Sequence, residues 1–455
     1  MADPQVVWPF QSALPGSTWP AIPAPNGAAV MALLFQLEQS QWFSPERLQA
    51  LQLRQLDALL KHAWHSAPWY RAHWQGIYDP TAPLDMVRFR TLPILKRADL
   101  RDNFEALKSA SYPAQHGSFS QTQSSGSTGT PVRLISTQLA YLMWIAFTLR
   151  DHAWHERNLS GKLGVIRVLA KADESANWGP ATAGLVNTGP SAVLPISTEV
   201  NEQLRWLEAQ QPEYLLSYPS NLAALARAAL KKSLRLPRLR EVRTLGEVVT
   251  PDTRDLVRQA WDVPVTDMYS AVEAGYLALQ CPKHPHYHVQ SEGVIVEVLD
   301  EQGEPCAPGD TGRVVITPLH NFAMPLVRYE IGDFAEVGPP CDCGRGLQVL
   351  TRIMGRERNM VITVDGRRYW PSFSGLSYDF PGLRRLQFVQ KSFDQIEARL
   401  VADAPLRAEH EALIRERLLA VLPPGLDVTF TYCADIPLGA GGKFEDFLCE
   451  IEGAA

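Results

Sequence analysis

Residues 213–269 read EYLLSYPSNLAALARAALKKSLRLPRLREVRTLGEVVTPDTRDLVRQAWDVPVTDMY. Short segments rich in β-branched and aromatic residues alternate here with segments in which alanine and leucine recur at helical spacing. Strands and helices of these lengths, taken in alternation, are typical of a sheet with crossover helices, so the stretch predicts an α/β fold. The predicted strands and helices are 213–218, 221–233, 241–246, 250–261 and 263–269.

The pattern extends toward the N-terminus and changes toward the C-terminus. Residues 163–170, LGVIRVLA, predict another buried strand, whereas 293–300 and 312–319 flank a turn-rich segment and predict an antiparallel hairpin. Farther on, a helix over 408–422 and a strand over 427–433 predict a mixed α+β unit. We therefore expect a large N-terminal domain of crossover-connected sheets with a small β-rich subdomain, and a small mobile α+β C-terminal domain.

The expected domain boundary lies between residues 357 and 358. Residues 1–357 would form the large domain and 358–455 the small one. Within the first, residues 1–40 begin with many prolines, alanines and glycines and are predicted to form an irregular arm. Ser44 followed by Pro45 then predicts the start of a helix, because serine caps helices and proline suits their first position.

Composition excludes several classes of protein. A chain of 455 residues, 45% hydrophobic and 20% charged, can bury more than one core. Its formal charge of −6 lacks the basic field that nucleic acid requires. The apolar run at 28–35 is too short to cross a bilayer and follows no basic segment. We therefore expect a cytoplasmic protein with no nucleic-acid or membrane partner; the sequence leaves a homodimer open.

A loop made of small hydroxyl residues and glycines is the first candidate site. It reads Ser124-Ser125-Gly126-Ser127-Thr128-Gly129-Thr130. Backbone amides and hydroxyls without bulky side chains can wrap closely around phosphate oxygens, which favours ATP as a ligand. The spacing does not match the G-x-x-x-x-G-K-[ST] loop. An ordinary surface turn is the alternative if the loop is taken alone.

Further motifs follow this loop in a fixed order. The chain resembles the adenylate-forming enzymes, and within them the phenylacetate–CoA ligase family, from about residue 42 to residue 450. The motifs that carry the resemblance after the loop are Gly246-Glu247, Tyr269-Ser270-Ala271-Val272-Glu273, Arg328-Tyr329-Glu330-Ile331-Gly332-Asp333, Arg352-Ile353-Met354-Gly355-Arg356 and Gly441-Gly442-Lys443-Phe444.

The resemblance implies a role for each motif. The loop at 124–130 would hold the β- and γ-phosphates of ATP, and Tyr269 would stack on adenine beside Gly246 and Glu247. Asp333 would bind the ribose hydroxyls and Glu273 would hold Mg²⁺. A divalent cation suits this chemistry, because an anionic carboxylate must attack the α-phosphate. Two further roles are implied: Lys443 would deliver positive charge during adenylation, and Arg356 would act at the domain junction.

Two positions depart from the family pattern. Thr130 stands where the loop often carries a lysine, so phosphate binding would rest on amides and hydroxyls. At the junction the family pattern is Gly-Arg-x-Asp-Asp-Met, whereas this chain has Arg358 and Asn359 before the methionine. These two residues could alter the domain rotation expected at this point, or mark an acceptor other than coenzyme A.

The cysteines form a separate cluster. Cys281 begins a segment rich in histidine, and Cys341 and Cys343 follow the Asp333 motif. If the two loops meet, three thiolates and one imidazole would form a tetrahedral set for a structural zinc ion. The family-like pattern favours His288 as the fourth ligand, with His284 as the alternative. Unliganded loop cysteines near a chance group of histidines are the other interpretation.

The acyl pocket is expected between the loop and Glu273. Its candidate residues are Tyr141, Trp144, Ala271, Ala274 and Gly275. Small residues beside Glu273 would leave room for an aromatic or other bulky acyl group. Plain core packing of the helical segment YLMWIAF, residues 141–147, is the alternative.

The predicted activity is ATP-dependent activation of a carboxylic acid as acyl-AMP with release of pyrophosphate, then acyl transfer to coenzyme A. An amine or a carrier protein remains an alternative acceptor. A nucleotide-binding protein that has kept the fold without catalysis is an alternative of another class, although Lys443, Glu273 and Asp333 are all present.

Overall fold

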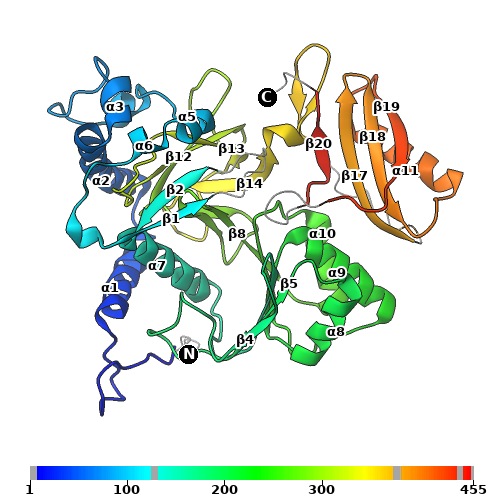
Figure 1. Cartoon of the computed structure of the whole chain (residues 1–455), viewed down its shortest axis with the longest axis horizontal. Helices are drawn as coiled ribbons and strands as arrows, with labels where there is room; N and C mark the ends of the chain where they lie inside the picture. The colour runs from blue at the N-terminus through cyan, green and yellow to red at the C-terminus, as the bar shows by residue number, and fades with distance from the viewer. Residues whose placement is uncertain (1–7, 124–131, 372–379, 381, 438–443, 452–455) are drawn as a thin grey trace.

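The centre of the molecule is one mixed β-sheet. The computed structural model describes residues 8–123, 132–371, 380, 382–437 and 444–451. Within them the sheet has twelve strands (Figure 1). In order across the sheet they are β11 (Val294–Leu299), β12 (Thr311–Pro318), β13 (Tyr329–Val337), β14 (Val349–Arg356), β10 (Tyr287–Val289), β9 (Gly275–Gln280), β8 (Val265–Ala271), β7 (Glu241–Leu245), β6 (Tyr214–Ser217), β3 (Leu163–Arg167), β5 (Ser191–Pro195) and β4 (Asp173–Ser175).

The sheet changes from parallel to antiparallel between β8 and β9. Strands β8, β7, β6, β3 and β5 pair in parallel, as the α/β prediction requires. The predicted hairpin is β11 and β12, which pair antiparallel. The β-rich part is not a separate sheet, however, because short β10 pairs with both β9 and β14 and joins the two halves. The parallel and antiparallel parts are therefore held in one frame.

Helices cover the sheet on different faces. Leucines and alanines of α8, α9 and α10 pack on the parallel strands in one cluster. The helices of the large domain are α1 (Pro25–Ser40), α2 (Pro45–Ser66), α3 (Pro68–His73), α4 (Met86–Arg90), α5 (Arg97–Asp102), α6 (Phe104–Leu107), the 3₁₀ turn η1 (Ala114–His116), α7 (Gln138–Trp154), α8 (Val200–Gln210), α9 (Pro219–Lys232) and α10 (Pro251–Trp261). None of the helices in the described ranges has both the length and the apolar character needed to span a membrane.

The predicted irregular arm over residues 1–40 is wrong for its second half. Residues Pro25–Ser40 form α1, which buries Val30 and Leu37 in a cluster shared with α7. The proline-rich sequence before this helix suggested irregular structure. Pro25 stands in the first turn, however, where its missing N–H removes no hydrogen bond of the helix. The helix start at Ser44 is confirmed, since its Oγ accepts the Arg47 N–H at 3.4 Å.

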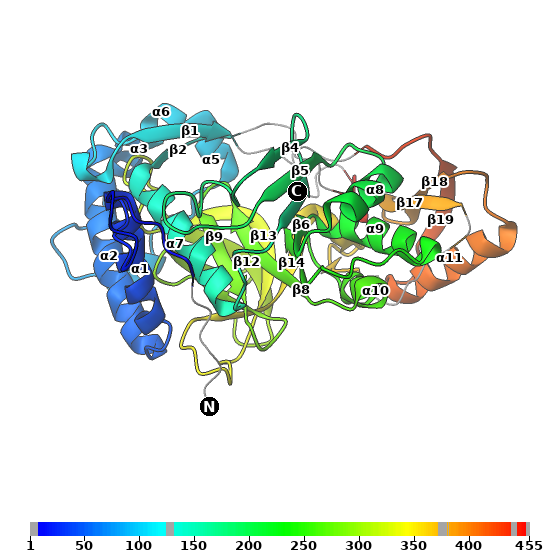
Figure 2. The ribbon, with the colours of Figure 1, turned by 90° about the horizontal axis from the view of Figure 1, so that it is seen from below.

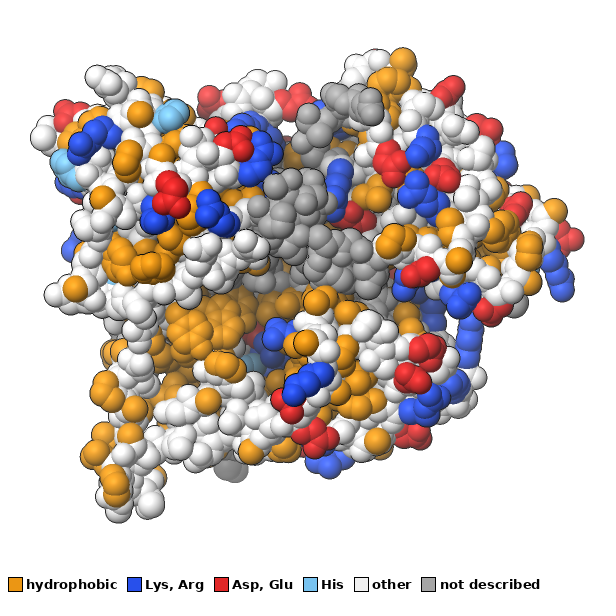
Figure 3. Space-filling view, viewed as in Figure 1, with side chains coloured by type: hydrophobic (Ala, Val, Ile, Leu, Met, Phe, Trp, Pro, Cys, Tyr) orange, Lys and Arg blue, Asp and Glu red, His pale blue; other side chains and the backbone are white. Residues whose placement is uncertain are grey.

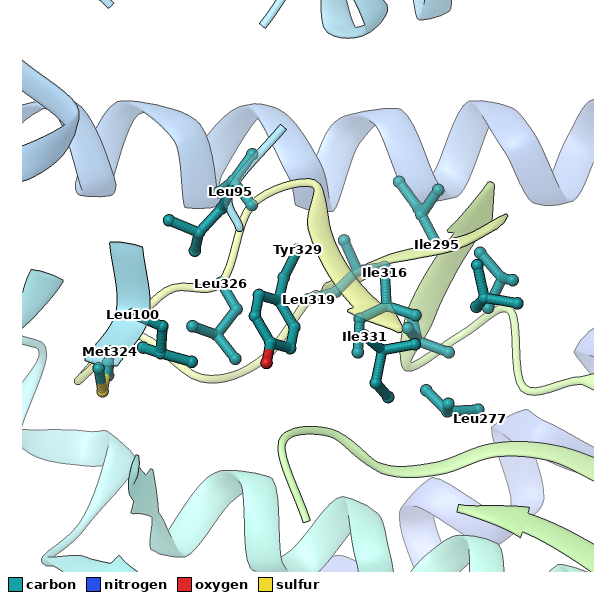
Figure 4. Packing of buried hydrophobic residues seen from close by; sticks show 14 of the residues in the cluster. Leu95, Leu100, Leu277, Ile295, Ile316, Leu319, Met324, Leu326, Tyr329 and Ile331 are labelled. Carbon is teal, nitrogen blue, oxygen red and sulfur yellow. The ribbon is translucent and has the colours of Figure 1, made fainter. Parts of the chain in front are cut away.

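The largest hydrophobic cluster joins the N-terminal helices to the antiparallel strands. Figure 4 shows Leu95 and Leu100 on one side of it and Ile316, Tyr329 and Ile331 on the other. The backbone is tied at the same place, where Leu95 N–H donates to the Arg328 carbonyl. This packing fixes the segment that enters α5, and so the position of Arg97, against β13.

A second, smaller sheet forms the C-terminal unit. Within the described residues its order is β19-β18-β17-β20, and α11 packs on it through Ile414 and Leu418. Figures 1 and 2 both show this unit beside α9 and α10, at the end of the molecule opposite α1 and α2. Its elements are η2 (Glu357–Asn359), β15 (Val361–Ile362), β16 (Arg368–Tyr369), β17 (Leu383–Ser392), β18 (Gln395–Ala402), α11 (Ala408–Val421), β19 (Asp427–Tyr432) and β20 (Phe447–Cys449).

Candidate active site

Three predicted residues, Tyr269, Asp333 and Arg356, meet near the C-terminal end of β8. Tyr269 Oη donates to Asp333 Oδ2 at 2.9 Å, and Arg356 Nε lies 3.2 Å from Asp333 Oδ1. Asp333 and Arg356 are paired residues of β13 and β14, so the sheet register brings them together. Burial, followed by the nearby Asp333 carboxylate, raises the pKa of Tyr269 well above its ordinary value. The phenol therefore stays a hydrogen-bond donor.

Glu273 lies just beyond the end of β8 with a side chain that is 7% exposed. Arg97 Nη1, from the first residue of α5, is 3.7 Å from Glu273 Oε1. Burial raises the pKa of Glu273, and Arg97 opposes this shift. Arg97 was not predicted as a site residue, because nothing in the local sequence around it points to Glu273.

Glu247 follows Gly246, whose φ of +77° turns the chain sharply at the end of β7. Its carboxylate accepts three hydrogen bonds: Ser220 N–H at 2.9 Å, Ser220 Oγ at 3.1 Å and Phe444 N–H at 2.8 Å. Burial raises the pKa of Glu247 to about 7. The contact with Phe444, which belongs to the C-terminal unit, was not predicted from the sequence.

Two of the predicted elements fall where the structure gives no description. The phosphate loop at Ser124–Thr130 and the residue Lys443 both lie outside the described residues. The strands on either side of the loop are described: β1 (Phe119–Gln123) pairs antiparallel with β2 (Arg133–Thr137), with Gln123 opposite Arg133. Their roles remain predictions.

Two of the predicted acyl-pocket residues belong to an aromatic stack, and a third lies against it. Tyr141 and Trp144, both on α7, stack with ring centroids 5.5 Å apart, and Trp144 and Tyr276 lie nearly parallel at 6.5 Å. Gly275 lies against this stack, since a Cβ there would be 3.6 Å from Trp144 Cδ1. Ala271 and Ala274 pack against the large cluster on the other side. Figure 3 shows hydrophobic side chains gathered in a hollow over α7, below the β1–β2 hairpin.

The two unusual junction residues contact the C-terminal unit. Arg358 Nη2 is 2.6 Å from Glu445 Oε1, and Asn359 Nδ2 donates to the Phe447 carbonyl at 2.8 Å. Asn359 Oδ1 also accepts the Arg356 N–H at 2.9 Å. Arg358 and Asn359 thus hold residues 445–447 next to η2, at the end of β14.

The cysteine and histidine loops do meet. Cys281 Sγ and Cys341 Sγ are 4.0 Å apart, and Cys343 Sγ is 3.3 Å from His288 Nε2. His286 is also close, because ligand atoms of Cys281, His286, His288 and Cys341 all lie within 4.8 Å of one another. His284 instead pairs with the exposed Asp342. For a zinc–sulfur bond of about 2.3 Å, two tetrahedral sulfur ligands lie about 3.8 Å apart, close to the separation of Cys281 and Cys341. The group of four mutually close donor atoms contains His286 and not the predicted ligand Cys343.

Comparison with known proteins agrees with this architecture. Residues 121–323 match the AMP-binding enzyme family, and residues 376–448 match the CapK C-terminal domain. The chain is 24% identical over 444 residues to a phenylacetate-coenzyme A ligase of Thermus thermophilus, covering 89% of this chain and 96% of that protein.

Two states of one solved structure distinguish the domain arrangement. A 2-hydroxyisobutyryl-CoA ligase in its postadenylation state, with 2-HIB-AMP, has a TM-score of 0.73 at 18% identity over 91% of this chain and 92% of its own. Its thioesterification state, with CoA, scores 0.58 at 20% identity over 91% of each chain. The overall fold of this chain is therefore more similar to the postadenylation form of that protein than to its thioesterification form.

Proposed function

We propose that this phenylacetate–coenzyme A ligase-like, adenylate-forming enzyme activates an aromatic or other bulky carboxylic acid as acyl-AMP and transfers the acyl group to coenzyme A. The observation that carries the proposal is the set of Tyr269, Asp333 and Arg356 beside Glu273. Tyr269 lies near the carboxyl end of the parallel strand β8, where α/β sheets bind nucleotides, and the antiparallel strands β13 and β14 bring Asp333 and Arg356 to it. The AMP-binding match includes both Tyr269 and Glu273.

The described residues have properties that suit these roles. Asp333, already held by Tyr269 and Arg356, offers a fixed carboxylate for ribose hydroxyls. Tyr269 would present its ring to adenine next to Gly246. Glu273 would hold Mg²⁺, because carboxylate oxygens are ligands that this ion prefers, and the ion would neutralise phosphate charge. The loop at 124–130 would bind the phosphates, and Lys443 would stabilise the charge that develops at the α-phosphate.

The acyl group would lie over the aromatic stack. Tyr141 and Trp144 offer flat aromatic surfaces. Gly275 has no side chain at the position that faces Trp144. Stacked aromatic residues favour a planar aromatic acid, because such rings pack with large contact areas. The matched Thermus protein carries phenylacetate in its name, which supports the same class.

We also propose a structural zinc ion at Cys281, His288, Cys341 and Cys343. Three sulfur donors and one imidazole would fill a tetrahedral shell and leave no open position for substrate. His286 could replace Cys343 as a ligand, since it lies in the same group of atoms. The site links the loop before β10 to the segment before β14 and would stabilise the junction between the two halves of the sheet.

The proposed division places the mobile domain after residue 357. Residues 1–357 would form acyl-AMP, and residues 358–455 would rotate about η2 between the two half-reactions. The end of β14 and the contacts of Arg358 and Asn359 support a hinge at this point.

The experiment is carboxylate-dependent exchange of labelled pyrophosphate into ATP. A panel of aryl and arylalkyl acids is tested with Mg²⁺ and compared with short aliphatic acids. The preferred acid is then offered with coenzyme A, with simple amines and with a phosphopantetheinylated carrier protein. Thioester formation with coenzyme A is the expected outcome. Transfer to an amine or a carrier protein alone would identify a different ligase, and no exchange with any acid would favour a noncatalytic nucleotide-binding protein.

A further inference from the structure

Glu247 joins two parts of the chain that must separate if the C-terminal unit rotates. Its carboxylate accepts the Phe444 N–H at 2.8 Å, across 197 positions of sequence. The same group accepts the N–H and Oγ of Ser220, in the first turn of α9. Tyr218, the N-cap residue of that helix, makes no side-chain capping bond. Glu247 therefore supplies the cap from another element.

Capping gives this carboxylate a fixed position. Oε2 accepts the Ser220 N–H at the helix N-terminus, whose partial positive charge stabilises an acidic group. Oε1 accepts both the Ser220 hydroxyl and the Phe444 N–H of the C-terminal unit. By contrast, the bonds from Arg358 to Glu445 and from Asn359 to Phe447 both lie on the C-terminal side of residue 357, within the unit that would rotate. A rotation about η2 could keep these two bonds but would break the one between Glu247 and Phe444.

We infer that Glu247 is a positioning residue that holds the backbone at Phe444 against the large domain for acyl-AMP formation and releases it for acyl transfer. The inference rests on the proposed two-step function. It assigns to Glu247 a role other than the adenine contact that the sequence predicted. Phe444 directly follows Lys443, so a bond at this amide restricts the chain next to the proposed catalytic lysine. The higher overall structural similarity to the postadenylation form than to the thioesterification form of the matched ligase supports the same assignment.

The first test needs no substrate. Amide hydrogen exchange is measured on the full chain for the residues 444–450, resolved to Phe444, in wild type, Glu247→Ala and Glu247→Gln. Exchange at Phe444 should become about tenfold faster in Glu247→Ala, because the acceptor is gone. Glu247→Gln keeps one acceptor oxygen for the two backbone N–H groups of Ser220 and Phe444, so it should restore only part of the protection. Glu208→Ala, on the exposed face of α8, is the matched control. Unchanged exchange at Phe444 in Glu247→Ala overturns the inference.

The second test separates the half-reactions. With the preferred acid, Glu247→Ala should form acyl-AMP about tenfold more slowly, while its transfer of the acyl group from supplied acyl-AMP to coenzyme A should stay within about twofold of wild type. Glu247→Gln, which keeps one acceptor oxygen, should again recover part of the first activity. An equal fall in both steps would indicate a merely structural role, and a rise in KM for ATP alone would indicate an adenine contact; either result overturns the inference. Failure of every acid in the exchange assay would instead contradict the proposed function and leave the amide-exchange result decisive for Glu247.

Discussion

Asp333 is held from two sides, because its Oδ2 accepts a 2.9 Å hydrogen bond from the Tyr269 hydroxyl while Arg356 Nε lies 3.2 Å from its Oδ1. The carboxylate of β13 is thus fixed against the Tyr269 ring of β8 by side chains of the protein itself. Because the Asp333 side chain is already held in place, less side-chain entropy is lost when a ligand binds to it.

Replacing Asp333 should weaken nucleotide binding. Asp333→Asn keeps the size of the side chain but removes the charge that pairs with Arg356 and accepts from hydroxyl groups. Because hydrogen bonds to charged groups are worth about 1.5–3 kcal/mol, KM for ATP should rise at least about tenfold. The measurement is pyrophosphate exchange at varied ATP, with Asp255→Asn on exposed α10 as control. An unchanged KM for ATP would remove Asp333 from the proposed nucleotide site.

Removing the charge of Glu273 should abolish most of the exchange activity. Glu273→Gln should lower the rate about 100-fold or more, because the proposed Mg²⁺ ion loses an anionic ligand close to the reacting phosphates. Exchange is measured over a range of Mg²⁺ concentrations, with the exposed Glu208→Gln as control. Wild-type exchange at low Mg²⁺ in Glu273→Gln would be incompatible with the proposed role.

Lys443 should matter to one half-reaction only. Lys443→Ala should slow acyl-AMP formation by about two to three orders of magnitude, as loss of a preorganised charge in a transition state typically does. Transfer from chemically synthesised acyl-AMP to coenzyme A should be retained. Both reactions are followed in the same preparation. Equal loss of both activities, or survival of exchange, would contradict the assigned role of Lys443.

The cysteine cluster should hold about one zinc ion per chain. Cys341→Ser and Cys343→Ser should each lower the zinc content and the thermal stability, because metal-binding free energy contributes to folding when the unfolded chain has no preformed site. Elemental analysis and thermal unfolding of gently purified protein provide the measurements. Cys306→Ser, whose thiol lies outside the cluster, is the control. Metal-free wild-type protein of full stability would refute the zinc proposal.

The hydrogen bond between Glu247 and the Phe444 N–H, which attaches the C-terminal unit to the large domain, should weaken as pH rises. Burial raises the pKa of Glu247 from its ordinary 4.5 to about 7 in the attached arrangement, and the Asp446 carboxylate adds to the shift. Arg227, on α9, is the cationic group that faces Asp446 among the described residues. The attached state therefore binds more protons than the released one. The stabilisation that Glu247 gives to the attached state is complete below about pH 4.5 and is lost as pH rises through about 7.

Amide exchange at Phe444, corrected for its intrinsic pH dependence, measures this effect. In wild type the protection should fall between pH 6 and pH 8. Glu247→Gln cannot titrate and should show a flat profile over the same range. The same slope in both proteins would assign the pH dependence to another group.

The sequence was sufficient for the features that depend on local pattern. Alternating strands and helices over 213–269 predicted the parallel part of the sheet, and the ordered motifs predicted the enzyme class. The cap at Ser44 and the hairpin of β11 and β12 also follow from residues close together in the chain. Where the local signal was mixed the prediction was wrong, as in α1, because a proline-rich beginning masked a helix whose buried face is defined only by its contact with α7.

Contacts between distant residues were decided by the tertiary structure alone. The sequence identified Glu273, Glu247 and Cys281 as chemically interesting, but it could not show that Arg97 faces the first, that Phe444 binds the second, or that Cys341 lies 4.0 Å from the third. Such pairs arise from sheet register, from the packing that fixes α5 and from the placement of the C-terminal unit. A hydrophobic pattern with a period of two residues in a strand, or 3.6 in a helix, determines which face of that element is buried. Which partner covers that face depends on how all the elements pack together.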